Sequence, residues 1–479
     1  MKKILSVMFA FMLMLSMVAC GSGSDAKQTT GATQTAPASP AFMAGFGVVD
    51  ITPKGSVPLS GYGNQATRFS TGMFSYLEAR CLAIIDENGD KLLFMVADLG
   101  FADVANSNQI LRRLEKKHGI PADHVVISGT HTHSSVAMYM TDVPAVAEFN
   151  TQYVNGMVEA AEIALADCKP ASVYVGSTMT ERLNFVRRYY MDTGALGGDG
   201  IYGAGTVYEE HESEADNELQ LMKFVREGGK DILVAQYQTH PHSLEGGGTN
   251  ISSQVAGGFR TYVESNMDVH CLFWNGAGGN LNNVSRIESE NRTKDHNEYC
   301  KLLGQYAIDA YDSLTQVQTG PIKVKTLTFE GKINHTEHHK LSDAQNVVAY
   351  FNECNDAAKT AYYGNQFGVH SLQHANRIIA NAGLGETVNI DLFAWSFGDV
   401  SGIVTEYEMF DTNGMEVKQG SPFAKTFIIG YSYPAQQGYI ASALGYQNGG
   451  YEVDNGIYAP GTGEELANAY LEMLKELKG

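Results

Sequence analysis

Residues 125–134 read VVISGTHTHS, and this stretch decides how the rest of the chain is interpreted. Four strand-forming residues run into a Gly-Thr turn, and His131 and His133 follow with one residue between them. Side chains at positions i and i+2 of an extended backbone point to the same side. The pattern therefore predicts two imidazoles that face one point at the end of a strand. Such a pair suits a metal site, a general base or both, and it also occurs in ordinary polar loops.

The residues before this stretch predict a parallel crossover. Residues 79–97 read as two strands joined across Asn88-Gly89, a strong hairpin signal, and Asp98 follows the second strand directly. Residues 104–117 have the apolar spacing of an amphipathic helix. Strand, helix and strand of these lengths predict a βαβ unit, so Asp98 and both histidines should lie at the carboxyl edge of a sheet. Ligands of open α/β sheets gather at that edge.

Two more predicted strands run into polar residues in the same way. The strand at residues 231–238 leads into His240 and His242, and the strand at residues 270–274 leads into NGAGGNLNN, residues 275–283. Three such strand ends favour one common pocket over three separate solvated loops. We therefore expect an α/β fold, in which one large mixed sheet has flanking helices and the active site lies at the carboxyl ends of its strands.

The composition describes an acidic protein that can bury a large core. The 479 residues carry a formal net charge of -20, with 44% hydrophobic and 18% charged residues. Nucleic acid is not an expected partner, because phosphate binding needs clustered Lys and Arg. The chain has no P-loop, GxGxxG or Gly-x-Ser-x-Gly motif, which argues against a serine hydrolase. The five cysteines after Cys20 are odd in number and widely spread, so they indicate free thiols, although one disulfide is possible.

The N-terminal residues predict export and lipid anchoring. Two lysines precede an apolar run, and residues 16–20, SMVAC, resemble a bacterial lipobox in which Cys20 is lipidated. We expect residues 1–20 to be a lipoprotein signal peptide, residues 21–41 a flexible tether, and residues 42–479 one catalytic domain. The apolar run is short for a spanning helix, which disfavours an uncleaved membrane anchor. The protein should therefore be extracytoplasmic and held at the bacterial cell membrane by its lipid.

The histidine loops alone indicate a metallohydrolase. Two histidine loops, one carboxylate and a water would make an open zinc site. Such a site lowers the pKa of bound water towards neutrality and polarises a carbonyl group. An arginine nearby could hold a developing oxyanion or an anionic substrate group. The spacing of the residues does not indicate the substrate.

Four motifs taken together resemble the neutral/alkaline ceramidase family. They are GFGVVDITP (45–53), ISGTHTHS (127–134), THP (239–241) and the Tyr- and Gly-rich segment 438–452. The resemblance extends from about Phe42 to the end of the chain. It implies a large α/β catalytic domain with a zinc-dependent amidohydrolase site, which cleaves the amide of ceramide to sphingosine and a fatty acid.

The resemblance also implies a role for each site residue. The family's ligands for one Zn²⁺ per chain fall on four residues here: His131, His240, Glu408 and Tyr439. His133 would move a proton, while Arg187 and Tyr451 would steady the oxyanion or the substrate head group. Two assignments stay open, because the family's Pro-Gly-Glu turn and Asn-Arg pattern are both altered here. Glu406 is the alternative to Glu408, and Arg188 is the alternative to Arg187.

Two departures from the family weaken ceramide as the specific substrate. The family's Gly-Asp-Val-Ser-Pro, whose serine has been assigned as catalytic, is replaced by GNLNN, residues 279–283, with Asn282 in place of the serine. A mechanism with metal-activated water survives that change, whereas a serine nucleophile does not. We also expect no C-terminal β-sandwich domain of the family type. The expected substrate is an N-acyl, ceramide-like lipid. The alternatives are a metal-dependent esterase or phosphatase, or a non-catalytic lipid- or glycan-binding lipoprotein.

Overall fold

A computed structural model describes residues 41–479, apart from residues 63–64, 199–200, 202–203, 243–247 and 434–437. The expected signal peptide, Cys20 and all but the last residue of the expected tether lie outside the described residues.

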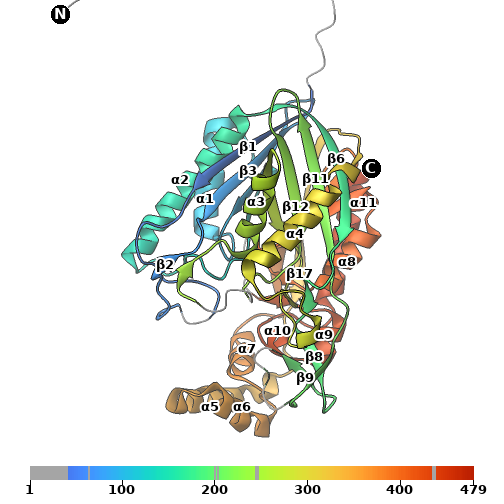
Figure 1. Cartoon of the computed structure of the whole chain (residues 1–479). Helices are drawn as coiled ribbons and strands as arrows, with labels where there is room; N and C mark the ends of the chain where they lie inside the picture. The colour runs from blue at the N-terminus through green and yellow to red at the C-terminus, as the bar shows by residue number, and fades with distance from the viewer. Residues whose placement is uncertain (1–40, 63–64, 199–200, 202–203, 243–247, 434–437) are drawn as a thin grey trace, which may run out of the picture. The chain divides into compact units, whose positions relative to one another are not determined.

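The first layer of strands is a nine-stranded mixed sheet in the order β14-β12-β11-β6-β1-β3-β4-β5, with β16 beside β6 (Figure 1). Its strands are β1 (Met43–Asp50), β3 (Glu78–Ile85), β4 (Lys91–Ala97), β5 (Val125–Gly129), β6 (Lys169–Met179), β11 (Glu218–Arg226), β12 (Asp231–Tyr237), β14 (Val269–Asn275) and β16 (Thr315–Gln316). The β3–β4 and β11–β12 hairpins are present, and β4 pairs with β5 in parallel. The predicted fold class, a large mixed sheet with flanking helices, is confirmed.

Four helices cover one face of this sheet (Figure 1). They are α1 (Val104–His118), α2 (Pro144–Ala166), α3 (Gln254–Asn266) and α4 (His296–Ala310). Helix α1 begins where the Asp103 side chain accepts a hydrogen bond from the backbone N–H of Asn106, and it ends at Gly119 with φ +65°. Helix α2 lies so close to β1 that a Cβ at Gly45 would be 2.0 Å from the Ala164 carbonyl oxygen. Glycine at that position permits the close approach.

A second sheet packs against the opposite face of the first. Its order is β17-β18-β19-β21, with β17 (Ile322–Lys332), β18 (Thr387–Phe397), β19 (Val400–Val404) and β21 (Lys425–Ile429). Side chains alternate across β3, so Cys81 faces the helices and Leu82 faces the second sheet. Both tryptophans of the chain, Trp274 and Trp395, lie in the core between the sheets, with ring centroids 6.1 Å apart.

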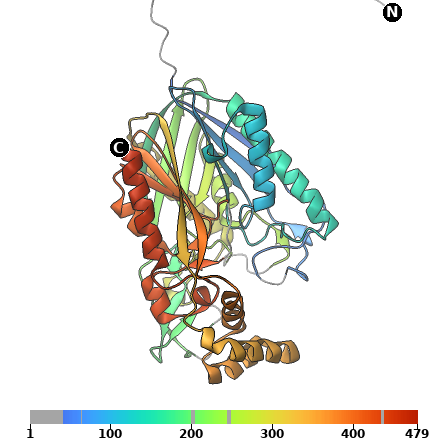
Figure 2. The same cartoon turned by 180° about the vertical axis from the view of Figure 1, so that it is seen from behind.

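Two helices cover the outer face of the second sheet, α8 (Asp411–Gly420) and α11 (Thr462–Lys478), and Figure 2 shows α11 along its strands. The layers therefore run helices, sheet, sheet, helices. Both faces of each sheet are covered, and this explains why β5 and β19 are buried at every residue.

Three further helices are α5 (Leu341–Cys354), α6 (Ala357–Gly364) and α7 (Leu372–Ala382), and α7 packs against the short helix α10 (Tyr451–Asp454) (Figure 1). The residue pattern over 344–360 predicts a single helical stretch. The structure divides it, because Asn355 has φ +46° and ends α5, and the Asp356 side chain then caps α6. Asparagine tolerates the left-handed conformation, and aspartate is a preferred helix cap.

Short elements connect these layers. They are β2 (Gly72–Met73), β7 (Phe185–Val186), β8 (Arg188–Met191), β9 (Leu196–Gly198), β10 (Tyr208–His211), β13 (Asn250–Ile251), β15 (Leu281–Asn282), β20 (Glu408–Met409), β22 (Tyr439–Ile440), α9 (Ala443–Asn448) and α10 (Tyr451–Asp454), with the 3₁₀ turns η1 (Ala122–His124), η2 (Glu288–Glu290), η3 (Tyr311–Ser313), η4 (His338–Lys340) and η5 (Asn365–Phe367). All five described cysteines are free thiols. In the part of the chain that the structure describes, no helix has both the length and the apolarity to cross a membrane.

Candidate metal centre

Three buried histidine side chains meet beyond the carboxyl ends of β5 and β12. His131 Nε2 lies 3.2 Å from His240 Nε2 and 3.3 Å from His133 Nε2. One nitrogen from each ring lies within 4.8 Å of the other two, and the three residues are 1–8% exposed. This group could hold a metal ion, and neutral imidazole is the commonest protein ligand for transition metals.

The His131 ring is oriented by its own loop. Strand β5 ends at Gly129, and His131 has φ +64°, so the predicted extended i, i+2 arrangement is wrong even though the two rings do meet. His131 Nδ1 lies 3.0 Å from the Gly100 carbonyl oxygen, and the Tyr431 ring stacks on the imidazole at 3.8 Å. A carbonyl oxygen accepts only from an N–H, so Nδ1 carries a proton, and the neutral ring then presents the Nε2 lone pair to the centre.

His240 is held in the same way by a different loop. Its Nδ1 lies 3.3 Å from the carbonyl oxygen of Gly278, in the glycine- and amide-rich segment after β14. A Cβ at Gly278 would lie 2.7 Å from the Thr239 carbonyl oxygen, so this close approach requires glycine. His240 therefore also presents the Nε2 lone pair to the centre.

Two hydrogen bonds hold the backbone of His133, whereas its ring is held less firmly than the rings of His131 and His240. Its N–H donates to Gln254 Oε1 at 2.8 Å, and its carbonyl oxygen accepts from Arg68 Nη1 at 2.8 Å. The ring makes an edge contact with Tyr62, and Nδ1 is buried without a hydrogen-bond partner in the described residues. A histidine with an unengaged ring nitrogen is suited to proton transfer.

Burial is the largest cause that lowers the pKa of His133 and of His240 well below the usual value for histidine. The neighbouring imidazoles and the positive charge of Arg187 lower both pKa values further. Both rings are therefore neutral near pH 7, which is the form that binds a metal ion.

Glu408 and Tyr439 complete the group. They are partners in the parallel pairing of β20 with β22, which brings side chains from distant parts of the chain together. Glu408 Oε2 lies 3.4 Å from His131 Nε2 and 3.8 Å from His240 Nε2, yet it is buried and has no hydrogen bond within the described part of the chain. Burial and the charge of Glu408 raise the pKa of Tyr439. A carboxylate oxygen that faces two nitrogen lone pairs is an arrangement that a cation would stabilise, so these residues fit a metal ion.

The structure places Glu408, and not Glu406, beside the histidines. Glu406 Oε1 accepts from the backbone N–H of Asp391 at 3.3 Å, and the residue lines a separate cavity. Burial raises the pKa of Glu406 to about 8.

The two neighbouring arginines have different surroundings. Arg187 donates from Nη2 to the Tyr439 hydroxyl at 3.1 Å and from Nε to Glu452 Oε1 at 2.7 Å. Its guanidinium carbon lies 5.7 Å from the Tyr451 ring centroid, so Arg187, Tyr439 and Tyr451 form one group. Arg188 is saturated by Glu212, Glu452 and two carbonyl oxygens, and no contact joins it to the metal-binding group in the described residues.

The loop NGAGGNLNN, residues 275–283, holds neighbouring segments in place through hydrogen bonds. The Gly279 N–H donates to the Met409 carbonyl oxygen at 2.9 Å, and the Asn280 amide exchanges two hydrogen bonds with Asp411. Asn280 also accepts from the backbone N–H of Arg187 at 2.8 Å. Asn282, which replaces the family serine, is buried in β15 and pairs with Phe185. The loop thus ties together the segments that carry Arg187 and Glu408.

Sequence reasoning missed two residues that shape the centre. Tyr431, which stacks on His131, has φ +56°, and Gln254, which holds the His133 backbone, has φ +46°. No motif in the sequence marks either position. His242 was visible in the THPH motif, and its ring centroid lies 4.8 Å from that of His133.

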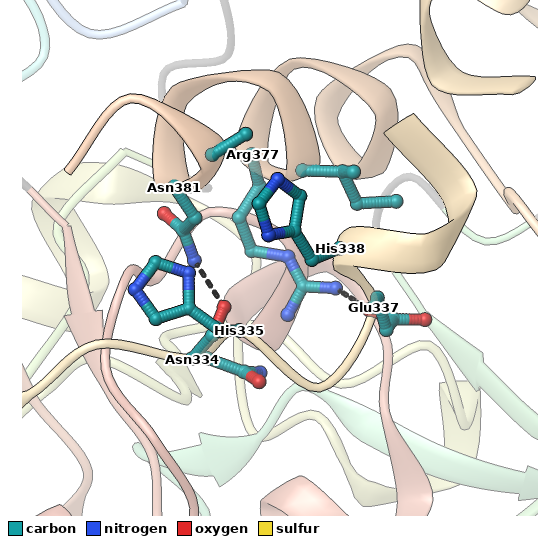
Figure 3. A pocket seen from close by; sticks show the side chains of 8 residues that line it. Asn334, His335, Glu337, His338, Arg377 and Asn381 are labelled. Atoms are coloured by element: carbon teal, nitrogen blue, oxygen red, sulfur yellow. Dashed lines mark hydrogen bonds and ion pairs between the residues drawn. The ribbon is translucent and has the colours of Figure 1, made fainter. Parts of the chain in front are cut away.

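A second group of histidines and carboxylates lies between α7 and η4, where Figure 3 shows Arg377 reaching Glu337 and Asn381 reaching Asn334. Glu337 also accepts from His374 Nε2 at 2.9 Å and from Lys340 Nζ at 2.8 Å. The pocket here has a volume of about 10 Å³. That is the lower limit for a single water molecule, so this pocket is not a ligand site.

Comparison with known proteins points to one family. The family model "Neutral/alkaline non-lysosomal ceramidase, N-terminal" matches residues 42–358. His131, His133, Arg187 and His240 lie inside the match, whereas Glu408, Tyr439 and Tyr451 lie beyond it.

Each match to a similar protein covers only part of that protein's length. Neutral ceramidase 2 of Arabidopsis thaliana is 24% identical over 47% of this chain, and neutral ceramidase of Drosophila pseudoobscura pseudoobscura is 33% identical over 20% of it. The chain spans 30% of the length of the plant protein and 14% of the length of the fly protein.

A crystal structure of neutral ceramidase from Pseudomonas aeruginosa has a similar fold. The TM-score is 0.68 at 17% sequence identity, and the match covers 91% of this chain and 74% of that chain.

Proposed function

This chain belongs to the neutral/alkaline non-lysosomal ceramidase family, and from that premise we propose that it is an extracytoplasmic, zinc-dependent amidohydrolase that cleaves a ceramide-like N-acyl lipid. One observation carries the proposal. A buried carboxylate oxygen of Glu408 and two histidine lone pairs converge within 3.2–3.8 Å, and no donor from the described chain lies between them.

One zinc ion would be held by four side chains: His131, His240, Glu408 and Tyr439. When bound, zinc polarises a carbonyl group and lowers the pKa of water. Tyrosine binds a metal as the phenolate, and burial opposes that form. The Arg187 guanidinium, 3.1 Å from the Tyr439 hydroxyl, supplies the positive charge that favours the phenolate.

The chain's own residues would move the proton and hold the oxyanion. The oxygen of the attacking water bonds to the amide carbon while the proton from that water passes to the neutral His133 ring. His133 then returns the proton to the amide nitrogen as the C–N bond breaks, which yields a carboxylic acid and an amine. Arg187 and Tyr451 lie against each other beside Tyr439 and would steady the oxyanion or the substrate head group. This path needs no serine at position 282.

Metal content and substrate class test the proposal together. We expect the purified full-length protein to hold one zinc per chain by mass spectrometry and to hydrolyse a long-chain N-acyl amide. The matched ester and phosphate should be hydrolysed more slowly. A protein that holds no metal and is inert on all three would be a binding protein instead. A preference for the ester or the phosphate would contradict the amide assignment.

The location is a separate part of the proposal. We infer that Cys20 is lipidated and that the lipid holds the protein at the cell membrane, because SMVAC has the lipobox pattern. A Cys20→Ser variant should move from the membrane fraction to the soluble fraction and lose the mass of the lipid. An unchanged distribution would exclude this anchor.

A further inference from the structure

A second cavity, of about 600 Å³, lies between the β5 edge of the first sheet and the second sheet. It is lined by the turn η1 before β5, by β17 and β18, and by the segment that contains Val404 and Glu406. None of the residues placed in the metal centre lines it. Its volume is within the range of small-molecule sites in proteins.

The walls of this cavity are apolar and acidic. Val125, Leu327 and Phe393 supply apolar surface, and Leu327 remains 42% exposed at the opening. Asp123, Asp391 and Glu406 supply carboxyl groups, while no Lys, Arg or His is among the described lining residues. An apolar cavity with only acidic charges favours a ligand that is both apolar and cationic.

The Glu406 carboxyl is the feature that requires a partner. The residue is 2% exposed, Oε1 has one backbone donor, and Oε2 is buried without a donor from the residues that the structure describes. A buried acceptor without a partner destabilises the folded protein. By contrast, the buried carboxyl of Glu452 has both Arg187 and Arg188. Oε2 of Glu406 keeps a lone pair for an N–H donor whether or not the carboxyl is ionised.

We propose that this cavity binds an amphiphilic primary amine, with its ammonium group at Glu406 and its alkyl chain along the apolar walls. Three N–H donors on one nitrogen can satisfy Glu406 Oε2 and still reach a second acceptor. A fatty acid of the same length would place a negative charge among three carboxyl groups, and an alcohol would bring no charge to offset theirs. The site goes beyond the proposed hydrolysis and does not depend on it.

Calorimetry with the full-length protein tests the site directly. The probes are dodecylamine and dodecanoate, each used below its micelle concentration, and dodecanol, used below its solubility limit. We expect saturable binding of one amine per chain and at least about tenfold weaker binding of the alcohol and the acid. The same binding should persist in a His131→Ala variant, which separates this cavity from the metal centre. Absence of amine binding, or equal binding of the three probes, would overturn the proposal.

Two variants and one control variant locate the binding. Glu406→Gln keeps the size of the side chain and should weaken amine binding by about ten- to hundredfold. Glu330→Gln changes an exposed carboxyl on β17 that does not line the cavity, and it should have no effect. Ala122→Trp places a large ring at the exposed edge of the cavity and should block binding while Glu406 is intact. Ala122→Trp still tests whether the amine binds in this cavity if Glu406→Gln does not fold. Unchanged affinity in Ala122→Trp would show that the amine binds elsewhere.

Discussion

The metal centre and the charged group around Glu337 both bury histidine beside carboxylate, but they satisfy these side chains in opposite ways. Glu337 accepts hydrogen bonds from His374, Lys340 and Arg377, and its charge is balanced by the chain itself. Glu408 Oε2 faces the lone pairs of His131 and His240 and has no donor among the described residues. The comparison teaches that the partners of a residue, and not its type or burial, separate a structural group from a site that takes a ligand.

The largest difference should appear when one histidine is removed from each group. His131→Ala should abolish zinc binding and amide hydrolysis together, because it removes a central ligand. His374→Ala is the matched control, since it removes an equally buried histidine from the charged group. It should lower thermal stability but leave one zinc per chain. Metal analysis and a hydrolysis assay of both variants measure this, and full activity in His131→Ala would refute the ligand assignment.

Breaking the charged group should lower the free energy of unfolding and leave the zinc content unchanged. Arg377→Met leaves Glu337 and Asp454 without a guanidinium partner. Loss of one partner from a buried charge pair costs about 3–5 kcal/mol, and the partial exposure of Glu337 places the expected loss near the lower figure. Chemical denaturation measures the loss. If zinc content fell with stability, the two regions would not be independent.

Removing the metal should destabilise the protein by a smaller amount. A ligand present at a hundred times its dissociation constant stabilises the folded state by about 2.7 kcal/mol. Dialysis against a chelator should therefore lower the melting temperature, and added Zn²⁺ should restore it. The His131→Ala variant should show no shift on either treatment. An identical shift in that variant would place the metal elsewhere.

The smallest expected effect is a pH dependence confined to the charged group. Hydrogen bonds from His374 and Lys340, and the charges of His374 and Arg377, lower the pKa of Glu337 below its usual 4.5. The stability that Glu337 contributes is therefore present above pH 4.5 and is lost as the pH falls towards the lowered pKa. The difference in unfolding free energy between wild type and Glu337→Gln should shrink as the pH falls below 4.5. A constant difference down to pH 3 would contradict this, and the zinc content of the two proteins should match at neutral pH.

Much of the first sheet could be predicted from sequence because its signals are local. The Asn-Gly hairpin, the helix between β4 and β5, and the histidines after β5 and β12 all follow from residues close together in the chain. The packing of the second sheet on the first could not be predicted, because the apolar residues that meet there, such as Trp274 and Trp395, are more than a hundred positions apart. Periodicity shows which face of a strand is apolar but not what covers it.

Two details of the metal centre also could not be predicted from residues close together in the chain. The left-handed backbone of His131 is held by Leu99, Gly100 and Tyr431 from other loops. The choice between Glu406 and Glu408 depends on the pairing of β20 with β22, which no short motif encodes. Both features depend on contacts that exist only in the folded protein.

The pairing of β20 with β22 has a consequence for when the centre can form. Glu408 and Tyr439 lie far beyond His131 and His240 in the chain, and they reach the histidines only after the two sheets have docked. A chain whose C-terminal part has not yet been synthesised thus has the imidazoles but lacks the carboxylate and the phenol. The order of synthesis itself would therefore delay tight capture of an ion until these later segments have been made and have folded onto the histidines.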